Sequence, residues 1–351
     1  YNSKYLHRID MTYALDASDF GSDEYRVFVA DTDNLRGDEL RGALIDKLYS
    51  AGVRVVAVPD GAAAGVLLDN YLQTGNTGNL DSYLSVLPAD RRDSARTLWE
   101  HVRTRYPGVF HAAGLGADAR SATVGKALTV LANASHNTPE TEIAEAVQAM
   151  RSGTTSNAVY WFKTAMAKYP RQMERFFGSS YAAVSRLYYA MQGTLNVADD
   201  SELPTYDAKQ LLKTYKKDGI LIFTDEASAL MTEGSMASEL QAQLDKQKYG
   251  EDEDPQRVCA IGAVYGTWSN AGSFTPDDTE TAWDADSLTE YLGSDALRGK
   301  DMLLALDGED SPYLTENCLL KDTDTPVAEQ LQKLFVLDKN NMASPETAKS
   351  E

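Results

Sequence analysis

Residues 24–60, EYRVFVADTDNLRGDELRGALIDKLYSAGVRVVAVPD, decide the fold of the first part of the chain. Tyr25, Val27 and Val29 alternate as they would on one face of a strand. The apolar residues that come next recur at helical spacing: Leu40, Leu44, Ile45, Leu48 and Tyr49. The β-branched run VRVVAV then indicates a buried strand. This order predicts a strand–helix–strand unit with a right-handed crossover between parallel strands.

The remaining sequence extends this to a chain that combines α/β and α+β structure. We predict a small βαβ-containing α/β domain at residues 1–78, which ends in the breaker-rich stretch TGNTGN. A helical domain or insert is predicted at 79–200, and a mixed α+β domain with a C-terminal helix at 201–351. Within these, residues 64–73 (AGVLLDNYLQ) are interpreted as a strand and 325–337 (TPVAEQLQKLFVL) as the amphipathic C-terminal helix.

Charge and hydropathy limit the partners. The 351 residues include 33 basic and 53 acidic side chains, a net charge of −20. Such an excess of negative charge disfavours nucleic acid or an anionic lipid surface as the main partner. No apolar run reaches 18 residues, so the sequence predicts no transmembrane segment. Protein partners or self-assembly are the expected interactions.

Two carboxylates, Asp31 and Asp33, stand at the end of the first strand of the βαβ unit. The structural interpretation is that they cap the following helix and interact with its positive N-terminal end. On this interpretation the sequence predicts no catalytic residue.

The alternative is catalytic. A strand that ends in DTDN resembles the first motif of haloacid dehalogenase-type phosphohydrolases, which implies a Mg²⁺-dependent reaction with Asp31 as nucleophile and Asp33 as general acid/base. Asp307 and Asp310, with Lys300 nearby, would supply the distant acidic motif. Two departures weigh against it: Pro59-Asp60 stands where that family has Ser or Thr, and the chain between Asp33 and the helix is too short for the family's flap.

Metal and cofactor motifs are missing from the sequence. The four histidines are His7, His101, His111 and His136. His101 and His111 are separated by a Pro-Gly break and lack the spacing of metal ligands on one helix. Gly114-Leu-Gly116 has no apolar strand before it, which disfavours a dinucleotide-binding loop. We therefore predict no metal and no cofactor.

Two cysteines, Cys259 and Cys318, lie in the last third of the chain. In an exported protein they would permit one disulfide. Two reduced, buried thiols are the equal alternative, and the sequence leaves both open.

The layout of the first 72 residues carries a family resemblance. It consists of a strand at residues 5–15, a strand at 24–34, a helix at 37–52, a strand at 53–60 that ends in Pro-Asp, and a small-residue step into 64–72. This order resembles the start of TraT-type outer-membrane lipoproteins. Similar layouts occur in the first domain of TolB-like proteins and in CsgG-like lipoproteins.

The resemblance implies a non-enzymatic structural or interaction protein of the cell envelope, in the periplasm or at the outer membrane, within a multi-subunit assembly. A lipid anchor is then expected upstream of Tyr1. The chain departs from the family in its centre, where a helical segment that carries Asp118, Arg120 and Lys126 replaces the Gly-rich apolar segment. Besides the phosphohydrolase, a further alternative is a soluble protein that binds a small ligand in a cleft between the helical segment and the C-terminal domain.

Overall fold

The computed structural model describes residues 6–9, 25–34, 36–116, 121–153, 155–193, 203–247, 256–269, 273–277, 283–284, 301–307, 311–315, 319–321 and 325–339. These residues form α-helices and a sheet with both parallel and antiparallel pairs, which confirms the predicted α/β class. The chain divides into two compact units. Unit 1 comprises residues 1–53 and 221–351, and unit 2 comprises residues 54–220. Residues 54–78, placed in the first domain by the sequence, thus belong with the helices of unit 2.

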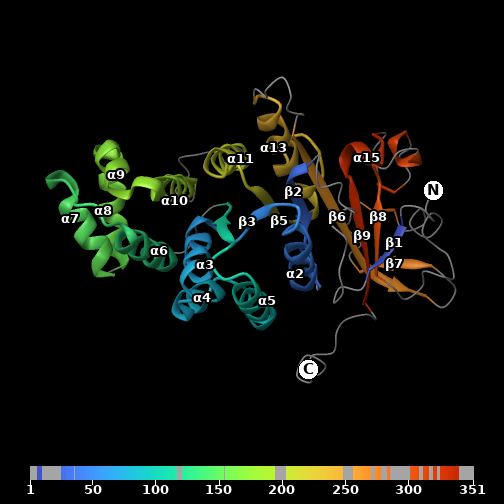
Figure 1. Cartoon of the computed structure of the whole chain (residues 1–351), viewed down its shortest axis with the longest axis horizontal. Coiled ribbons are helices and arrows are strands. Elements are labelled where there is room, and N and C mark those ends of the chain that lie inside the picture. The colour runs from blue at the N-terminus through green and yellow to red at the C-terminus, as the bar shows by residue number, and fades with distance from the viewer. Residues whose placement is uncertain are drawn as a thin grey trace. The chain divides into compact units, whose positions relative to one another are not determined.

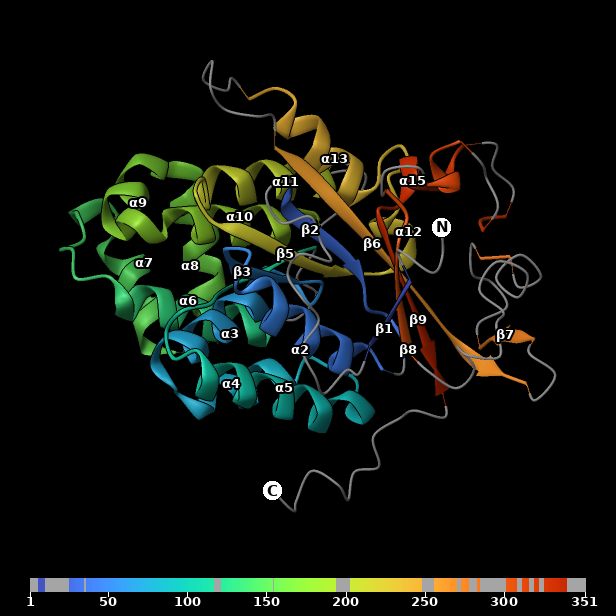
Figure 2. The same ribbon diagram turned by 45° about the vertical axis from the view of Figure 1, so that its right-hand side comes forward.

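Unit 1 is built around a sheet (Figure 1 and Figure 2). Its strands are β1 (Leu6–Ile9), β2 (Tyr25–Asp31), β5 (Gly219–Thr224), β6 (Arg257–Trp268), β7 (Phe274–Pro276), β8 (Asp301–Ala305) and β9 (Lys333–Asp338). Its helices are α2 (Gly37–Leu48), α12 (Glu226–Ala229), α13 (Met236–Leu244), the 3₁₀ turn η5 (Pro312–Leu314) and α15 (Val327–Gln330).

The strand order in unit 1 is β1-β8-β9-β6-β2-β5, with β7 paired to β6. β6 pairs in parallel with β2 on one side and with β9 on the other, and β8 runs antiparallel to β9. All seven residues of β2 and all six of β9 are buried. Strands buried on both faces need not alternate apolar and polar residues, and this explains the continuous apolar runs of this part of the sequence.

The strand–helix–strand order of the opening stretch is confirmed by β2, α2 and β3 (Val53–Val58). Leu40, Leu44, Ile45 and Leu48 are fully buried on α2, as their helical spacing predicts. Gly52, at the turn before β3, has φ 86°, a conformation that residues with a side chain rarely adopt.

Unit 2 contains β3, β4 (His111–Gly114) and most of the helices (Figure 1). The helices are α3 (Ala62–Thr74), α4 (Thr77–Leu84), η2 (Ala89–Arg91), α5 (Arg92–Arg105), α6 (Ser121–Ala134), α7 (Thr141–Ser152), α8 (Thr155–Lys168), α9 (Pro170–Phe177), η3 (Gly178–Ser180), α10 (Tyr181–Gly193) and α11 (Leu203–Thr214). β3 and β4 are parallel, with Val55 opposite His111 and Val58 opposite Gly114. The helices from α6 to α10 share one apolar core, in which Phe162, Phe176 and Phe177 are buried.

Two secondary-structure predictions were wrong. Residues 64–73 lie in helix α3 instead of a strand, because Leu67, Leu68, Tyr71 and Leu72 have the spacing of one helical face and are all buried there. The predicted C-terminal helix ends after one turn at Gln330, and the chain continues as strand β9. Leu334 and Phe335 fit a helical stripe equally well, but both are buried between β8 and β6, where a strand completes the backbone hydrogen bonds.

A close approach of two backbones fixes the position of α3 on β4. A Cβ added to Gly65 of α3 would overlap the backbone of Gly114, and one added to Gly114 would overlap the carbonyl of Gly61. Glycine at both positions lets the helix lie directly on the strand. Among the described residues, no helix combines the length and the hydropathy that a membrane span requires.

Candidate functional site

The predicted carboxylate pair lies where β2 and β5 end side by side. The backbone N–H of Thr32 donates to the carbonyl of Thr224, the last residue of β5, at 2.9 Å. Asp31 is buried at 6% exposure, whereas Asp33 is exposed. Oδ1 of Asp31 accepts the backbone N–H of Asp33 at 3.1 Å. The contact therefore joins one side chain to the other residue's backbone.

Neither carboxylate caps α2, so the capping interpretation was wrong. The helix begins at Gly37, and its N-cap residue, Arg36, makes no side-chain capping bond. Asn34 fills part of this role, since its Oδ1 accepts the N–H of Arg36 at 3.0 Å.

Burial makes the carboxyl group of Asp31 a weaker acid than an exposed aspartate. Removal from water is the main cause that raises the pKa of its carboxyl to about 7; the nearby charges of Glu226, Asp33 and Asp225 add to it, and the hydrogen bond from the Asp33 N–H opposes it. A carboxyl group that titrates near neutrality can exchange protons. Within the described ranges, however, no group of three or more acidic, His or Cys side chains could hold a metal ion.

The distant acidic motif of the phosphohydrolase alternative is only partly described. Asp307 is held inside unit 1, where Lys333 Nζ donates to its Oδ1 at 2.6 Å and the Tyr25 hydroxyl donates to its Oδ2 at 2.5 Å. Lys300 and Asp310 lie outside the described residues. So does Cys318; Cys259 has a free, buried thiol, which fits the alternative of two reduced thiols.

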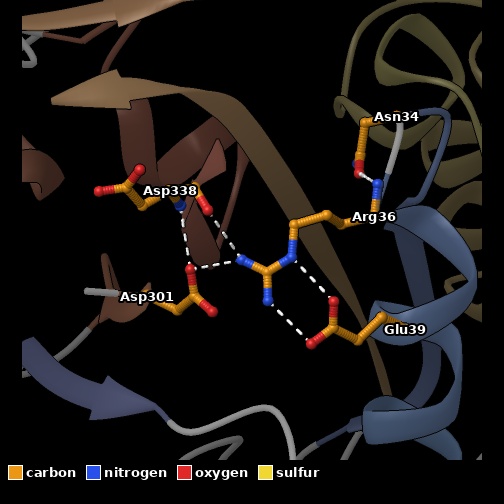
Figure 3. Close-up of polar contacts among 5 residues, drawn as sticks. All are labelled: Asn34, Arg36, Glu39, Asp301 and Asp338. Atoms are coloured by element: carbon orange, nitrogen blue, oxygen red, sulfur yellow. Dashed lines mark hydrogen bonds and ion pairs between the residues drawn. The ribbon is translucent and has the colours of Figure 1, made fainter. Parts of the chain in front are cut away.

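Arg36 is the centre of a buried network of ion pairs and hydrogen bonds in unit 1 (Figure 3). Its Nη1 donates to Oδ1 of Asp301 at 2.6 Å and to the carbonyl of Asp338 at 3.1 Å, and its Nε and Nη2 both donate to Glu39 at 2.8 Å. Burial acts to lower the pKa of the guanidinium, but Glu39 and Asp301 together raise it above its usual range. The network ties the segment after β2 to β8 and β9, which is a structural role.

A cavity of about 330 Å³ lies within unit 2, lined by residues of α3, β4, α6, η3, α10 and the end of α11 with the residue that follows it. Its apolar part includes Ala62, Val66, Val130, Leu131, Ala134 and Ala183. The polar part gathers His111, Asp69, Arg186 and Tyr215 with the hydroxyl groups of Ser179, Ser180 and Thr214. An apolar enclosure with a few convergent polar groups is typical of small-molecule sites.

His111 and Asp69 form a hydrogen-bonded pair in this lining. Nδ1 of His111 lies 3.0 Å from Oδ1 of Asp69, and the same oxygen accepts the backbone N–H of Ala112 at 3.0 Å. The hydrogen bond that the imidazole makes to Asp69 raises its pKa, with a smaller contribution from Asp218 and an opposing one from burial. The ring of Tyr215 lies 6.2 Å from that of His111, centroid to centroid, and burial raises the pKa of Tyr215 to about 12.

Arg186 of α10 supplies a second paired charge. Its Nη2 donates to the carbonyl of Gly114, and its Nε lies 3.5 Å from Oδ1 of Asp207. Asp207 also accepts the N–H of Gly116 at 3.0 Å. Burial raises the pKa of the Asp207 carboxyl, against the lowering effect of Arg186.

This site was not predicted from the sequence. Because residues 64–73 were interpreted as a strand, Asp69 was not placed on a helix. β4 is too short to show a hydrophobic period. Gly114 was considered only for a dinucleotide loop, and the statement that no strand precedes it was wrong, because it ends β4. The available signal was His111 at the first position of HAAG, shortly after the break at Pro107-Gly108.

No family model matches this sequence, and no curated protein does so. Solved structures do share the fold. A protein from Bacillus cereus has a TM-score of 0.63 at 12% identity over 96% of this chain and 95% of its own. A succinoglycan biosynthesis protein has a TM-score of 0.60 at 13% identity over 95% and 94%. A mutant erythromycin esterase in its open conformation has a TM-score of 0.55 at 11% identity over 92% and 94%. At these identities the likeness shows the fold alone.

Proposed function

We propose that this protein binds a small organic molecule in the cavity of unit 2. The observation that carries the proposal is the convergence of His111, Asp69 and Arg186 on a mainly apolar enclosure of about 330 Å³. That volume lies at the lower end of the range of known ligand pockets, roughly 300–1,000 Å³. The site differs from the cleft expected in the sequence, because every lining residue lies between residues 62 and 215.

A fragment screen by ligand-observed NMR tests the proposal. Ala134 ends α6, is exposed on one side and lines the cavity, so Ala134→Phe would fill space without displacing a buried residue. Fragments bound in the cavity should be lost in this variant and retained in Asn133→Phe, which adds the same ring at a neighbouring exposed position outside the lining. Fragments that bind both variants equally, or a screen without hits, would count against the cavity.

A second candidate function is hydrolysis of the bound molecule. It is supported by the His111–Asp69 pair, in which a carboxylate orients an imidazole as in enzymes that use histidine as a general base. The fold shared with an erythromycin esterase is compatible with it. Turnover of a panel of simple esters that is lost in His111→Gln would support this candidate, and turnover indifferent to that substitution would exclude His111.

The envelope location, the lipid anchor and self-assembly stay predictions of the sequence resemblance. Size-exclusion chromatography with light scattering tests self-assembly, and a strict monomer at high concentration would oppose it. The Asp31/Asp33 phosphohydrolase likewise stays a prediction, which a phosphatase assay with Asp31→Asn as control would test.

A further inference from the structure

The charge at the cavity of unit 2 depends on whether His111 carries a proton. Asp69, His111 and Arg186 line the cavity, and Asp207 pairs with Arg186 at 3.5 Å. With both carboxyl groups ionised and the imidazole neutral, the two carboxylates and the one guanidinium leave one negative charge in excess. A proton on His111, whose Nδ1 lies 3.0 Å from Asp69, removes this excess. The neutral imidazole therefore leaves the cavity short of one positive charge.

The groups that face His111 favour a positive charge beside it. The hydrogen bond to Asp69 raises the pKa of the imidazole, and the charge of Asp218 acts in the same direction. Tyr215, whose ring lies 6.2 Å from that of His111, stays uncharged at neutral pH because burial raises its pKa to about 12. The aromatic face of a neutral tyrosine is itself favourable to cations.

Arg186 is the charge that opposes a cation at the cavity. Its Nη2 donates to the carbonyl of Gly114, whereas its Nε makes no hydrogen bond to any described residue. The carboxylate of Asp207 offsets the guanidinium charge at 3.5 Å, so the pair adds little net charge to the site. The net charge of −20 over the whole chain attracts cations at long range and repels anions.

Asp69 keeps one carboxylate oxygen for a ligand. Its Oδ1 accepts the backbone N–H of Ala112 at 3.0 Å and lies 3.0 Å from Nδ1 of His111. In the part of the chain that the structure describes, no group donates a hydrogen bond to Oδ2, and the side chain of Asp69 is 34% exposed. An ammonium group that donates to Oδ2 would make a charge-assisted hydrogen bond there.

We propose that the cavity binds an organic cation, an ammonium group on an apolar body, which replaces the proton of His111 as the positive partner of Asp69. The inference rests on the proposed function and specifies its ligand class. Ala62, Val66 and Leu131 contact the apolar body. Because the imidazolium and the ammonium compete for one carboxylate, the bound cation and the bound proton weaken each other by the same factor.

Three probes that share one apolar body and differ in charge test the ligand class. They are 4-phenylbutylammonium, 4-phenyl-1-butanol and 4-phenylbutanoate, each titrated into the full chain and followed by NMR. At pH 9 the imidazole is neutral in more molecules than at pH 6, whereas an alkylammonium, with a pKa of about 10.4, is still charged. The ammonium should then bind about tenfold more tightly than the alcohol, and the carboxylate should bind most weakly.

The exchange with the proton has two measurable signs. The affinity for the ammonium should rise about tenfold from pH 6 to pH 9, whereas the affinity for the alcohol should change less. Saturation with the ammonium should also lower the pKa of the His111 imidazole by about one pH unit, because the linkage is reciprocal. Titration of the imidazole signals with and without the probe measures this second effect.

Matched variants assign both signs to the cavity. Asp69→Asn removes the carboxylate and should abolish the preference for the ammonium over the alcohol, whereas Asp81→Asn removes an exposed carboxylate outside the lining and should retain it. His111→Gln keeps an amide that can donate to Asp69 but takes up no proton, so its affinity for the ammonium should be nearly independent of pH. Ala134→Phe should remove the binding of the ammonium altogether. The three probes and the titration of His111 in the wild-type chain remain decisive if Asp69→Asn does not fold.

The other outcomes separate this inference from the proposed function. Equal binding of the ammonium and the alcohol at pH 9, or tighter binding of the carboxylate, would overturn the cationic ligand. An affinity for the ammonium that does not change with pH, together with an unchanged pKa of His111, would overturn its exchange with the proton. Failure of all three probes, with other fragments still sensitive to Ala134→Phe, would overturn the inference and leave the proposed function in place. A screen without any cavity-bound fragment would remove both.

Discussion

Arg36 and Asp301, 265 positions apart in the sequence, form an ion pair of 2.6 Å in which both side chains are at least 95% buried. Because Asp301 also accepts the backbone N–H of Asp338 at 2.9 Å, one carboxylate joins the segment after β2 to the ends of β8 and β9. Contacts between segments so distant in sequence close large loops, so their loss should affect the whole of unit 1.

Replacement of Arg36 by Met should lower the free energy of unfolding of unit 1 by about 3–5 kcal/mol, because it leaves Asp301 as a buried charge without its main partner. Urea unfolding followed by far-UV circular dichroism measures the change. Arg96→Met is the matched control: Arg96 also lies 2.6 Å from a carboxylate, Asp81, but both side chains are at least 40% exposed. There the expected change is below about 1 kcal/mol. Equal losses in the two variants would contradict the structural role given to Arg36.

The contact of α3 with β4 predicts a second stability effect. Gly65→Ala should lower the free energy of unfolding of unit 2 by about 1–3 kcal/mol, because the new methyl group must push the helix off the backbone of Gly114. The same shift would move Asp69 away from His111, so binding of cavity ligands should weaken as well. Thermal unfolding and fragment titration measure the two effects.

Gly78→Ala, at the start of α4, is the control for this substitution. A Cβ there meets only the side-chain oxygen of Asn76 at 3.3 Å, and alanine favours the helical state by up to about 1 kcal/mol. It should therefore change stability little or increase it. If Gly65→Ala behaves in the same way, the helix does not need glycine to lie on the strand.

The fold was predictable where a short stretch carries a complete period. Leu40, Leu44 and Leu48 mark one face of α2, and the apolar, β-branched runs of β2 and β3 stand on either side of it, so the βαβ order could be predicted locally. Local patterns failed where burial on both sides removes the period. In β9, Leu334 and Phe335 are adjacent and both buried between two strands, a pattern that a helix of the same composition would also show.

The candidate site was not predictable for a different reason. Asp69 and His111 are 42 positions apart, and neither belongs to a motif with fixed spacing. Their contact exists because Gly65 lets α3 approach β4, and that approach depends on packing between elements. At Asp31 and Asp33 a local motif is present, but the structure buries one carboxylate and exposes the other, which the motif alone does not predict.

The buried carboxyl of Asp31 predicts a pH-dependent stability. Its pKa is about 7 in the folded chain against an ordinary value of 3.8, so the folded state binds a proton more tightly than the unfolded state. The charged carboxylate therefore destabilises the fold above pH 4, increasingly up to about pH 7, by at most about 4 kcal/mol. Asp31→Asn removes this destabilising charge. The variant should therefore become increasingly more stable than the wild-type chain as the pH rises from 5 to 8.

Urea unfolding at pH 5, 6, 7 and 8 measures the difference between the two chains. Asparagine keeps the oxygen that accepts the N–H of Asp33, so the loop after β2 should keep its conformation. Asp33→Asn makes the same chemical change at an exposed neighbour and reports the effect of removing one charge from the acidic surface. A stability difference for Asp31→Asn that is constant over this pH range would contradict the raised pKa.

The pair formed by His111 and Asp69 predicts a change that NMR can detect at one residue. The hydrogen bond to Asp69 raises the pKa of the imidazole, so Asp69→Asn should lower it, because an amide oxygen stabilises the imidazolium less than a carboxylate does. A histidine with a raised pKa stabilises the fold below its unfolded-state value of about 6.5, and this contribution is lost as the pH rises through the folded-state pKa. The variant should therefore lose stability at pH 5 and little at pH 9.

Titration of the imidazole signals from pH 5 to 9 tests this directly, with His111→Gln used to assign the signal among the four histidines. Asp81→Asn, which removes an exposed carboxylate outside the cavity, is the control and should leave the titration of His111 in place. An unchanged pKa in Asp69→Asn would show that the carboxylate does not orient the imidazole.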